Sequence, residues 1–442
     1  MEEVIEKSIE CPSCKVTITY NPNYAEWCQE CEWNLKFEDK IKSKSKFEEF
    51  YLKISKIQSK YLFEKVINED LFNLKISKLR IIAYIASFFI IILNFSFLII
   101  GIYLLFLNWG GISNYLLSFV FLAIFWLSKP SLRKIPKDDF LSKDNFPELY
   151  NLVNQVCNEL KTTNVEGIIL NEDFNASISE YGFSRKKVLR IGLPLWNVLN
   201  EEEKLDLLGH EISHCTNKDP SRRIVIGTAI DILIDTGHAI YPDKLLSNDI
   251  SSDTWGYIPM ELGKYVAIPI NLLLRLISHI LYFFARSLCQ MIWVDSQRAE
   301  YLADLNATKI MGKKSAISGM EKSFLYEIID FELSKLALKN NKELENIDFF
   351  TILNDKVSNL PFHETERLKR LSKFENHRLD ATHPPTIYRI KMLEKKGFET
   401  GNFNKEKVDF EKIKEEISKI EHNIKYKLID IYKSRLFIRY SY

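Results

Sequence analysis

Residues 201–217 read EEEKLDLLGHEISHCTN and hold the pattern His-Glu-x-x-His at 210–214. Asn200 followed by Glu203 is typical of a capping box and predicts a helix over roughly 201–217. Positions i and i+4 share a helix face, so both imidazoles can reach one Zn²⁺, and Glu211 then lies beside the metal to take a proton from a zinc-bound water. Two ordinary surface or core histidines would give the same pattern, so it is only suggestive by itself.

A catalytic zinc needs a third protein ligand and keeps its fourth position for water. With His210 and His214 as the first two ligands, the candidate for the third is Glu300 in RAEYLADLNA (298–307). Asp304 follows one turn later on the same face and could accept the other ring N–H of a zinc histidine. An ordinary solvated pair of carboxylates is the alternative, and it would be favoured if no zinc helix preceded it.

The segment 262–297 is mostly apolar but carries one polar stripe at helical spacing, aligned with Glu300 in the part after Pro269. Such a helix could line a wet cleft or a membrane-embedded cavity, and a plain amphipathic core helix is an equal alternative. Residues 223–240 carry a similar polar face, which argues against an isolated membrane span there. The residues are Lys264, Asn271, Arg275, His279, Tyr282 and Arg286 in the first segment, and Asp231, Asp235 and His238 in the second.

Two uncharged apolar stretches, 81–107 and 112–128, predict a pair of membrane helices. Basic residues flank both outer ends, so the positive-inside rule places both ends in the cytoplasm. A hairpin buried in a soluble core is the alternative. The first 36 residues are polar and Cys-rich without the apolar core of a signal peptide, so the membrane helices are expected to act as the targeting signal.

The composition bounds the possible functions. The chain has 442 residues, 46% of them hydrophobic, and a formal net charge of +1. A charge so close to neutral argues against a dedicated nucleic-acid binder, so no nucleic-acid partner is expected. The apolar fraction excludes disorder over most of the chain, and the length allows two to four units of ordinary domain size.

Four of the seven cysteines form two Cys-x-x-Cys pairs in CPSCKVTITYNPNYAEWCQEC (11–31). An alternating VTITY run and a turn separate the pairs, which is typical of a hairpin that closes a tetrahedral zinc site in a reducing compartment. The alternatives are a redox dithiol or two unrelated pairs. We predict a structural zinc ribbon, with the ligands Cys11, Cys14, Cys28 and Cys31.

Taken together, these motifs make the chain resemble the HtpX-like and CAAX-prenyl-protease-type zinc metallopeptidases, a membrane branch of the gluzincins. The resemblance covers roughly 140–395 together with the membrane hairpin. It implies an α+β, mostly helical fold: a membrane-anchored gluzincin-type metallopeptidase domain, here with a small N-terminal zinc ribbon. The motifs that carry it are Asn175-Ala176, LLGHEISHCTNKDP (207–220), EYLAD (300–304) and THPPTIYRI (382–390).

The resemblance implies His210, His214 and Glu300 as ligands of the catalytic zinc and Glu211 as the general base. It also implies that Asn175 and Ala176 dock the substrate backbone as an added strand.

His383 and Arg389 would lie near the cleft by the same resemblance, stabilising the oxyanion or bracing the ligand helix. Without the resemblance, THPP is merely a turn before a helix.

Two features depart from the family pattern. Such enzymes do not generally begin with a zinc ribbon, and the second pair of membrane helices is poorly formed, which allows the catalytic domain to sit on the membrane face.

Five regions are predicted along the chain. The stretch after the ribbon is basic, with apolar residues at helical intervals, and predicts an amphipathic helix running up to the bilayer or, equally, a solvated linker helix. The regions are a zinc ribbon at 1–36, a basic amphipathic helical linker at 37–79, a transmembrane helical hairpin at 80–128, a zinc metallopeptidase domain at 129–400 and a charged helical tail at 401–442.

The expected function is that of a membrane-bound zinc-dependent endopeptidase with two zinc ions, one catalytic and one structural. A zinc-activated water, with Glu211 as general base, would hydrolyse the peptide bond. Its expected partners are polypeptide substrates and the lipid bilayer. By analogy, the substrates are membrane or misfolded proteins and the role is membrane-protein quality control, with a prenylated-protein protease as a narrower alternative.

The expected location is the cell (inner) membrane, multi-pass, with the N-terminus and the active site in the cytoplasm. The rival hypothesis is a catalytically silent client-binding scaffold, or a membrane scaffold gated by the zinc or redox state of the ribbon.

Overall fold

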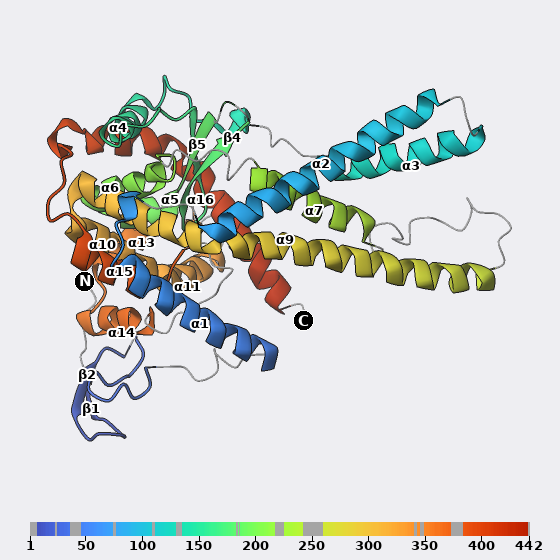
Figure 1. The fold of residues 1–442 in the computed structure, drawn as a ribbon. Helices are drawn as coiled ribbons and strands as arrows, with labels where there is room; N and C mark the ends of the chain where they lie inside the picture. The colour runs from blue at the N-terminus through green and yellow to red at the C-terminus, as the bar shows by residue number, and fades with distance from the viewer. Residues whose placement is uncertain are drawn as a thin grey trace. The chain divides into compact units, whose positions relative to one another are not determined.

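The computed structural model describes residues 7–22, 24–35, 46–73, 77–107, 111–129, 135–182, 184, 186–216, 225–241, 260–339, 343–344, 349–372 and 383–440. The chain folds into two units, and its elements are labelled in Figure 1. Unit 1 comprises Met1–Phe72, Lys134–Asn217 and Gln297–Tyr442, and unit 2 comprises Asn73–Arg133 and Lys218–Ser296. The fold is α+β and mostly helical, as predicted.

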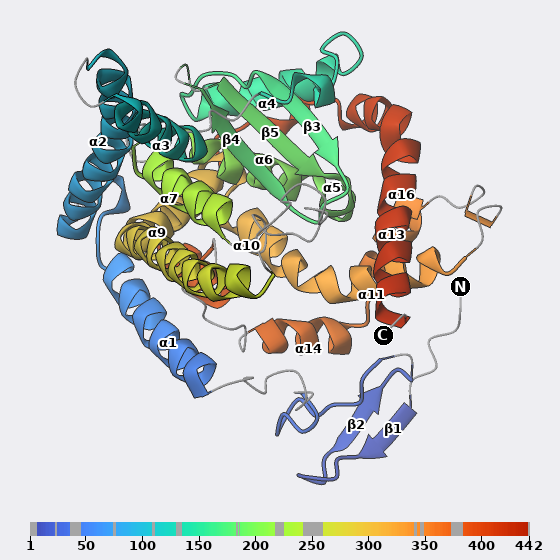
Figure 2. The same ribbon diagram turned by 90° about the vertical axis from the view of Figure 1, so that its right-hand side faces the viewer.

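The main sheet of unit 1 has the strand order β3-β5-β4 (Figure 2). β3 (Gly167–Asn171) runs parallel to β5 (Lys186–Gly192), and β4 (Ala176–Tyr181) runs antiparallel to it. β3 is buried at four successive positions, whereas β4 alternates between buried and half-buried residues at its start, which is typical of an edge strand. No described strand pairs with the other edge of β4.

Helices pack around this sheet and share one hydrophobic core with it. Buried members of the core include Leu189 of β5, Val153, Leu208 and Leu428. A separate antiparallel hairpin, β1 (Lys7–Glu10) with β2 (Thr17–Tyr20), carries the cysteine pairs. The helices of unit 1 are α1 (Lys46–Val66), α4 (Pro147–Glu159), α5 (Leu193–Val198), α6 (Glu201–Ser213), the last part of α9 (Met260–Met311), α10 (Lys313–Lys322), α11 (Tyr326–Ala337), α13 (Phe349–Ser358), α14 (Phe362–Ser372), α15 (Thr386–Lys396) and α16 (Phe410–Tyr440).

The C-terminal end of α1 is built into unit 1. Val66 is fully buried, and the Arg298 guanidinium on α9 donates to both carboxylate oxygens of Glu69, at 3.1 and 2.8 Å. From α15, Lys396 Nζ donates to the backbone carbonyl of Val66 at 3.1 Å. The basic stretch before α2 is therefore attached at this end to two helices that come much later in the chain.

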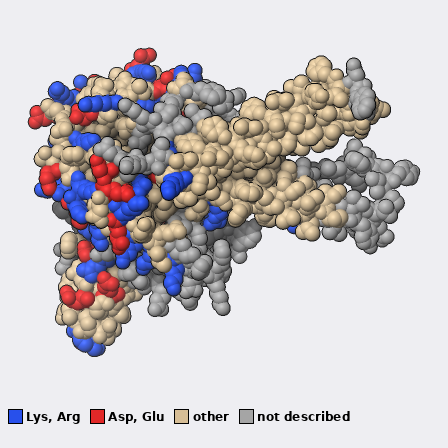
Figure 3. All heavy atoms as spheres, in the orientation of Figure 1, with Lys and Arg blue, Asp and Glu red and all other residues tan. Residues whose placement is uncertain are grey.

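Unit 2 consists of apolar helices. α2 (Lys78–Phe106) packs along α3 (Ile112–Ser128), and α7 (Gly227–Ile240) contacts both. Figure 3 shows a surface almost without charged side chains over α2 and α3. By length and composition, α2 and the stretch Pro269–Met311 of α9 could each cross a membrane, and α3 is a shorter apolar helix of 17 residues.

The predicted polar stripe lies on α9, which is continuous through Pro269. The face of α9 packed in unit 2 is small or apolar, with Ala285 and Leu288 buried, while Arg275 and His279 are exposed.

The stripe meets the polar face of α7 at one place, where the Tyr282 hydroxyl lies 3.1 Å from His238 Nδ1. Gly237 makes room for this contact, because a Cβ there would lie 2.7 Å from the Tyr282 ring. The side chain of Lys264 lies outside the described residues. That the stripe lines a wet cavity stays a prediction.

Candidate active site

The helix that carries the His-Glu-x-x-His pattern begins with the predicted capping box. The side chain of Asn200 accepts from the Glu203 backbone N–H at 2.9 Å, and the Glu203 carboxylate accepts from the Asn200 backbone N–H at 2.8 Å. α6 ends earlier than predicted, at Ser213 with His214 as its C-cap. The cause is local, because the N–H groups of residues 214–216 bond three residues back and turn the chain out of the helix.

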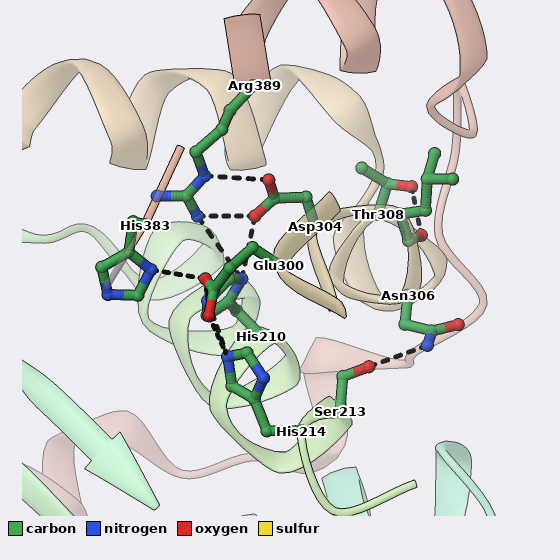
Figure 4. Close-up of polar contacts among 10 residues, drawn as sticks. His210, Ser213, His214, Glu300, Asp304, Asn306, Thr308, His383 and Arg389 are labelled. Atoms are coloured by element: carbon green, nitrogen blue, oxygen red, sulfur yellow. Dashed lines mark hydrogen bonds and ion pairs between the residues drawn. The ribbon is translucent and has the colours of Figure 1, made fainter. Parts of the chain in front are cut away.

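Three side chains from α6, its C-cap and α9 point their donor atoms at one another (Figure 4). His210 Nε2 lies 3.2 Å from His214 Nε2. Glu300 Oε2 lies 3.6 Å from His210 Nε2, and Glu300 Oε1 lies 3.6 Å from His214 Nε2. Tetrahedral zinc with Zn–N bonds of about 2.0–2.1 Å would hold two such atoms roughly 3.3 Å apart. Two imidazole nitrogens and one carboxylate at these separations fit a zinc ion.

Asp304 fixes the ring of the first histidine. Its Oδ1 lies 2.9 Å from His210 Nδ1, which leaves Nε2 directed at the other donors. Asp304 is fully buried and also accepts from Arg389, Nε at 2.8 Å and Nη2 at 2.6 Å. Arg389 lies on α15, so this pair ties α15 to the helix that carries Glu300.

The electrostatics of the two imidazoles differ. Burial disfavours the charged form of His210, but hydrogen bonds to Asp304 and Glu300 outweigh it and raise the pKa of His210 to about 10. Burial and the neighbouring charge of His210 lower the pKa of His214 to about 4. The carboxylates that stabilise a proton on His210 would equally stabilise a divalent cation held by its ring.

His383 lies at the same place, immediately before α15. Its Nδ1 contacts Glu300 Oε2, and its side chain is 40% exposed. His383, His210 and Glu300 also offer donor atoms within 4.8 Å of one another. Because its ring bonds to the carboxylate, His383 can orient Glu300 and present a polar group to a bound molecule. Thr382, which precedes it in the sequence motif, lies outside the described residues.

A cavity of about 380 Å³ opens beside these donors. Glu211 lines it and is 6% exposed. Burial raises the pKa of Glu211, although the positive charges of His210 and His383 act to lower it. Asn175, Asp206, Thr386 and Arg389 also line the cavity.

Asn175 is exposed just before the edge strand β4, and Ala176 is the first residue of that strand. The backbone carbonyl of Asn175 accepts from the Gly192 N–H at 2.8 Å. Gly192 is required there, since a Cβ would lie 1.7 Å from the Asp173 carbonyl oxygen and 2.6 Å from that of Asn175. The close crossing brings Asn175 to the wall of the cavity.

The four predicted ribbon cysteines form one cluster. Cys11 Sγ lies 3.6 Å from Cys31 Sγ, and Cys14 Sγ lies 3.6 Å from Cys28 Sγ. All four sulfur atoms are within 4.8 Å of one another. Zn–S bonds of about 2.3 Å at tetrahedral angles separate sulfurs by roughly 3.8 Å, so the set fits a structural zinc.

The attachment of this cluster to the rest of unit 1 was not predicted from the sequence. The Trp27 ring lies 4.8 Å from that of His363 on α14, and the Arg370 side chain donates to the Gln29 backbone carbonyl at 2.6 Å. Trp27 is fully buried. A tryptophan within a loop that should otherwise be solvated was the available signal.

Asp206 was missed as well. It lies on α6 one turn before His210 and is 4% exposed at the cavity. The available signal was its place in LDLLGHE, a carboxyl among apolar residues of a helix that packs into a core.

Comparison with known proteins identifies the region that holds these residues. The protein-family model described as Peptidase family M48 matches residues 148–396, which is more than half of the chain. Protease HtpX homolog 1 of Saccharolobus solfataricus is 26% identical over 216 residues, 45% of this chain and 63% of the relative. Protease HtpX homolog 2 of Sulfurisphaera tokodaii is 28% identical over 181 residues, 38% of this chain and 54% of the relative.

The chain thus spans less than two thirds of the length of these curated relatives. No solved structure matches it significantly. The family match runs from α4 through α15 and includes the zinc helix, the Glu300 helix and Arg389. From this match, the chain belongs to peptidase family M48.

Proposed function

We propose that this chain is a membrane-bound, zinc-dependent endopeptidase. The observation that carries the proposal is the convergence of His210, His214 and Glu300 at a cavity that also holds Glu211. Membership of a peptidase family and similarity to two proteins named as proteases support peptide-bond hydrolysis. A zinc ion held by these three donors would supply a Lewis acid and a bound water of lowered pKa.

The roles of the protein groups follow from their positions. An extended peptide would bind along the open edge of β4, with Asn175 at the end beside the cavity. Glu211 is buried with a raised pKa, so its carboxylate can take a proton from the attacking water and deliver it to the leaving amine nitrogen. His383 would donate to the developing oxyanion. Arg389 would act through Asp304, by holding the ligand helix in place.

We further propose a structural zinc at the four cysteines, which would make two zinc ions per chain. The sulfur separations of 3.6 Å support it, and a hairpin with so small a core needs such a metal.

The apolar helices of unit 2 and the basic residues that flank the hairpin support insertion in the cell membrane with both hairpin ends in the cytoplasm. Misfolded membrane proteins would supply the extended segments that strand addition needs. This fits a role in membrane-protein quality control.

The test compares the detergent-solubilised protein with Glu211→Gln, which keeps shape and ligands but removes the base. With zinc present, hydrolysis of an unfolded protein and self-cleavage should fall by at least about 10²-fold. Glu201→Gln, at an exposed position on the same helix, is the matched control and should cleave normally. Zinc content should be equal in all three proteins. Equal cleavage by the parent and Glu211→Gln would contradict the assignment of Glu211, and no cleavage by a folded, zinc-loaded parent would contradict the peptidase.

A further inference from the structure

A buried carboxyl group lies in the cavity without a role in the proposed hydrolysis. Asp206 is 4% exposed, and neither of its carboxylate oxygens has a hydrogen-bond partner among the residues that the structure describes. The Ser315 hydroxyl and the backbone at Met311 are near enough to favour its charged form, but neither makes a hydrogen bond of good geometry. A buried carboxyl without partners is costly to the folded protein, which indicates that Asp206 binds a group other than the described side chains.

The charged groups around Asp206 are engaged elsewhere. Glu203 is paired with Lys322 at 2.7 Å and accepts from the Ser318 hydroxyl at 2.6 Å. Glu202 is paired with Lys405 at 2.6 Å. Burial, followed by the charge of Glu202, raises the pKa of Asp206 to about 9. The neighbouring lysines therefore have carboxylate partners already, and the potential at Asp206 favours a positive group.

The cavity of about 380 Å³ has room for a long side chain. The small residues Ala307, Ala316 and Gly319 line it together with Asp206, His210 and Glu211. A substrate residue beside the bond to be cleaved could extend an aliphatic stem along these small residues. Its terminal group would then reach Asp206.

We infer that this cavity is a specificity pocket for a lysine or arginine side chain of the substrate, next to the scissile bond, with Asp206 as the group that binds its cation. An ammonium or guanidinium group can donate to both carboxylate oxygens, and such charge-assisted bonds are strong in a buried site. A substrate with an apolar side chain would leave Asp206 without a partner. The inference rests on the proposed endopeptidase activity and names its substrate preference.

The experiment uses the full-length, zinc-loaded protein in detergent and peptides that differ only in one residue, lysine or norleucine, beside the cleaved bond. The parent should cleave the lysine peptide with a kcat/KM about tenfold or more above the norleucine peptide. Asp206→Asn should remove most of that ratio, and Asp206→Leu should invert it in favour of norleucine. Inversion is a gain that a damaged fold cannot produce. Glu201→Gln, at an exposed position on the same helix, is the matched control and should keep the parent's ratio.

A binding measurement separates this inference from the peptidase proposal. Fluorescence anisotropy of the labelled peptides with the Glu211→Gln protein reports the pocket without turnover. The lysine peptide should bind more tightly than the norleucine peptide, and the difference should disappear when Asp206→Asn is added. This result would support the pocket even if the parent cleaved neither peptide. If the parent, Asp206→Asn and Asp206→Leu all showed the same ratio of lysine to norleucine peptide, in cleavage or in binding, the inferred pocket would be wrong. The peptidase proposal would be unaffected.

Discussion

The two candidate metal centres of this chain are built in opposite ways. Four thiols lie on the loops of a two-stranded hairpin, whose core consists of a few residues around Ile18. The His210 centre lies on two long helices, and α6 belongs to the large core of unit 1. Apart from a metal, the hairpin region is held by this small core and by the contacts of Trp27 and Gln29 with α14, whereas the helices hold their donors in place by packing in a large core.

The number of donors differs as well. The cysteine cluster supplies all four ligands that tetrahedral zinc needs, so it is closed to other molecules. At the helical centre, His210, His214 and Glu300 leave room for a fourth ligand beside a cavity. A zinc ion would thus stabilise the fold at the cysteine cluster, whereas at the helical centre the fold itself would hold a reactive zinc in place.

The largest effect is expected from His214→Gln. Loss of one of only three ligands should remove one zinc per chain and lower peptide hydrolysis by about 10³-fold or more, because both the metal and its water are lost. The α6 helix should stay folded, since its core contacts do not include this side chain. Zinc analysis, peptide hydrolysis and circular dichroism measure the three quantities. Global unfolding of this variant would contradict the view that the fold precedes the metal here.

A smaller loss is expected from Asp304→Asn. The substitution keeps the size of the side chain but weakens its bonds to His210 and Arg389, so zinc affinity or activity should fall by about 10–100-fold. Zinc affinity by competition with a chelator, and kcat/KM at saturating zinc, are the measurements. Glu399→Gln, whose carboxylate is largely exposed, is the control. Unchanged zinc affinity would show that the ring of His210 does not depend on Asp304.

Cys28→Ser should affect the other centre. We expect loss of the second zinc and unfolding of the hairpin, visible as new proteolytic cleavage before residue 36, because such small sites fold only with metal. Peptide hydrolysis should change by less than about tenfold, as all proposed catalytic groups lie elsewhere. Cys289→Ser, at an exposed cysteine outside both clusters, is the control for loss of a thiol. A collapse of hydrolysis in Cys28→Ser alone would mean that the ribbon gates the peptidase.

The smallest effect concerns the stability of the helical centre. The pKa of Asp206 is raised from 3.8 to about 9, so the folded protein holds a proton there that the unfolded chain has lost at neutral pH. This destabilises the fold increasingly as pH rises from about 4 towards 9. Asp206→Asn should therefore raise stability by about 1–3 kcal/mol at pH 8 and by little at pH 4.5. Thermal unfolding at the two pH values measures it, and an equal gain at both would show that the charge of Asp206 is not responsible.

Much of the candidate site could be predicted because its signals are local. The capping box lies within four residues and the His-Glu-x-x-His pattern within five, and the geometry of an α-helix sets both. Glu300 and Asp304 share one face by the same rule. The apolar helices α2 and α3 were predicted from uncharged length alone, which needs no knowledge of neighbours.

The remainder depends on contacts between distant segments. The bond between Asp304 and Arg389 joins residues 85 positions apart, and only a family resemblance pointed to Arg389. The place of Asp206 among apolar residues indicates burial, but nothing in the sequence says that it lacks a partner. The same holds for Trp27 against His363, since a local pattern does not reveal which surface will cover an aromatic ring.

The bond between Glu69 and Arg298 has a consequence for anyone who wishes to excise a soluble peptidase. Arg298 is 6% exposed, and the Glu69 carboxylate that it binds is encoded before α2. A truncated gene that starts after the hairpin would keep the guanidinium and delete the carboxylate, along with the Val66 carbonyl that binds Lys396. The shorter protein would contain every catalytic motif, but the packing beside the helix that carries Glu300 would be less stable. An anchor-free version should instead retain 46–73 and replace the hairpin by a linker.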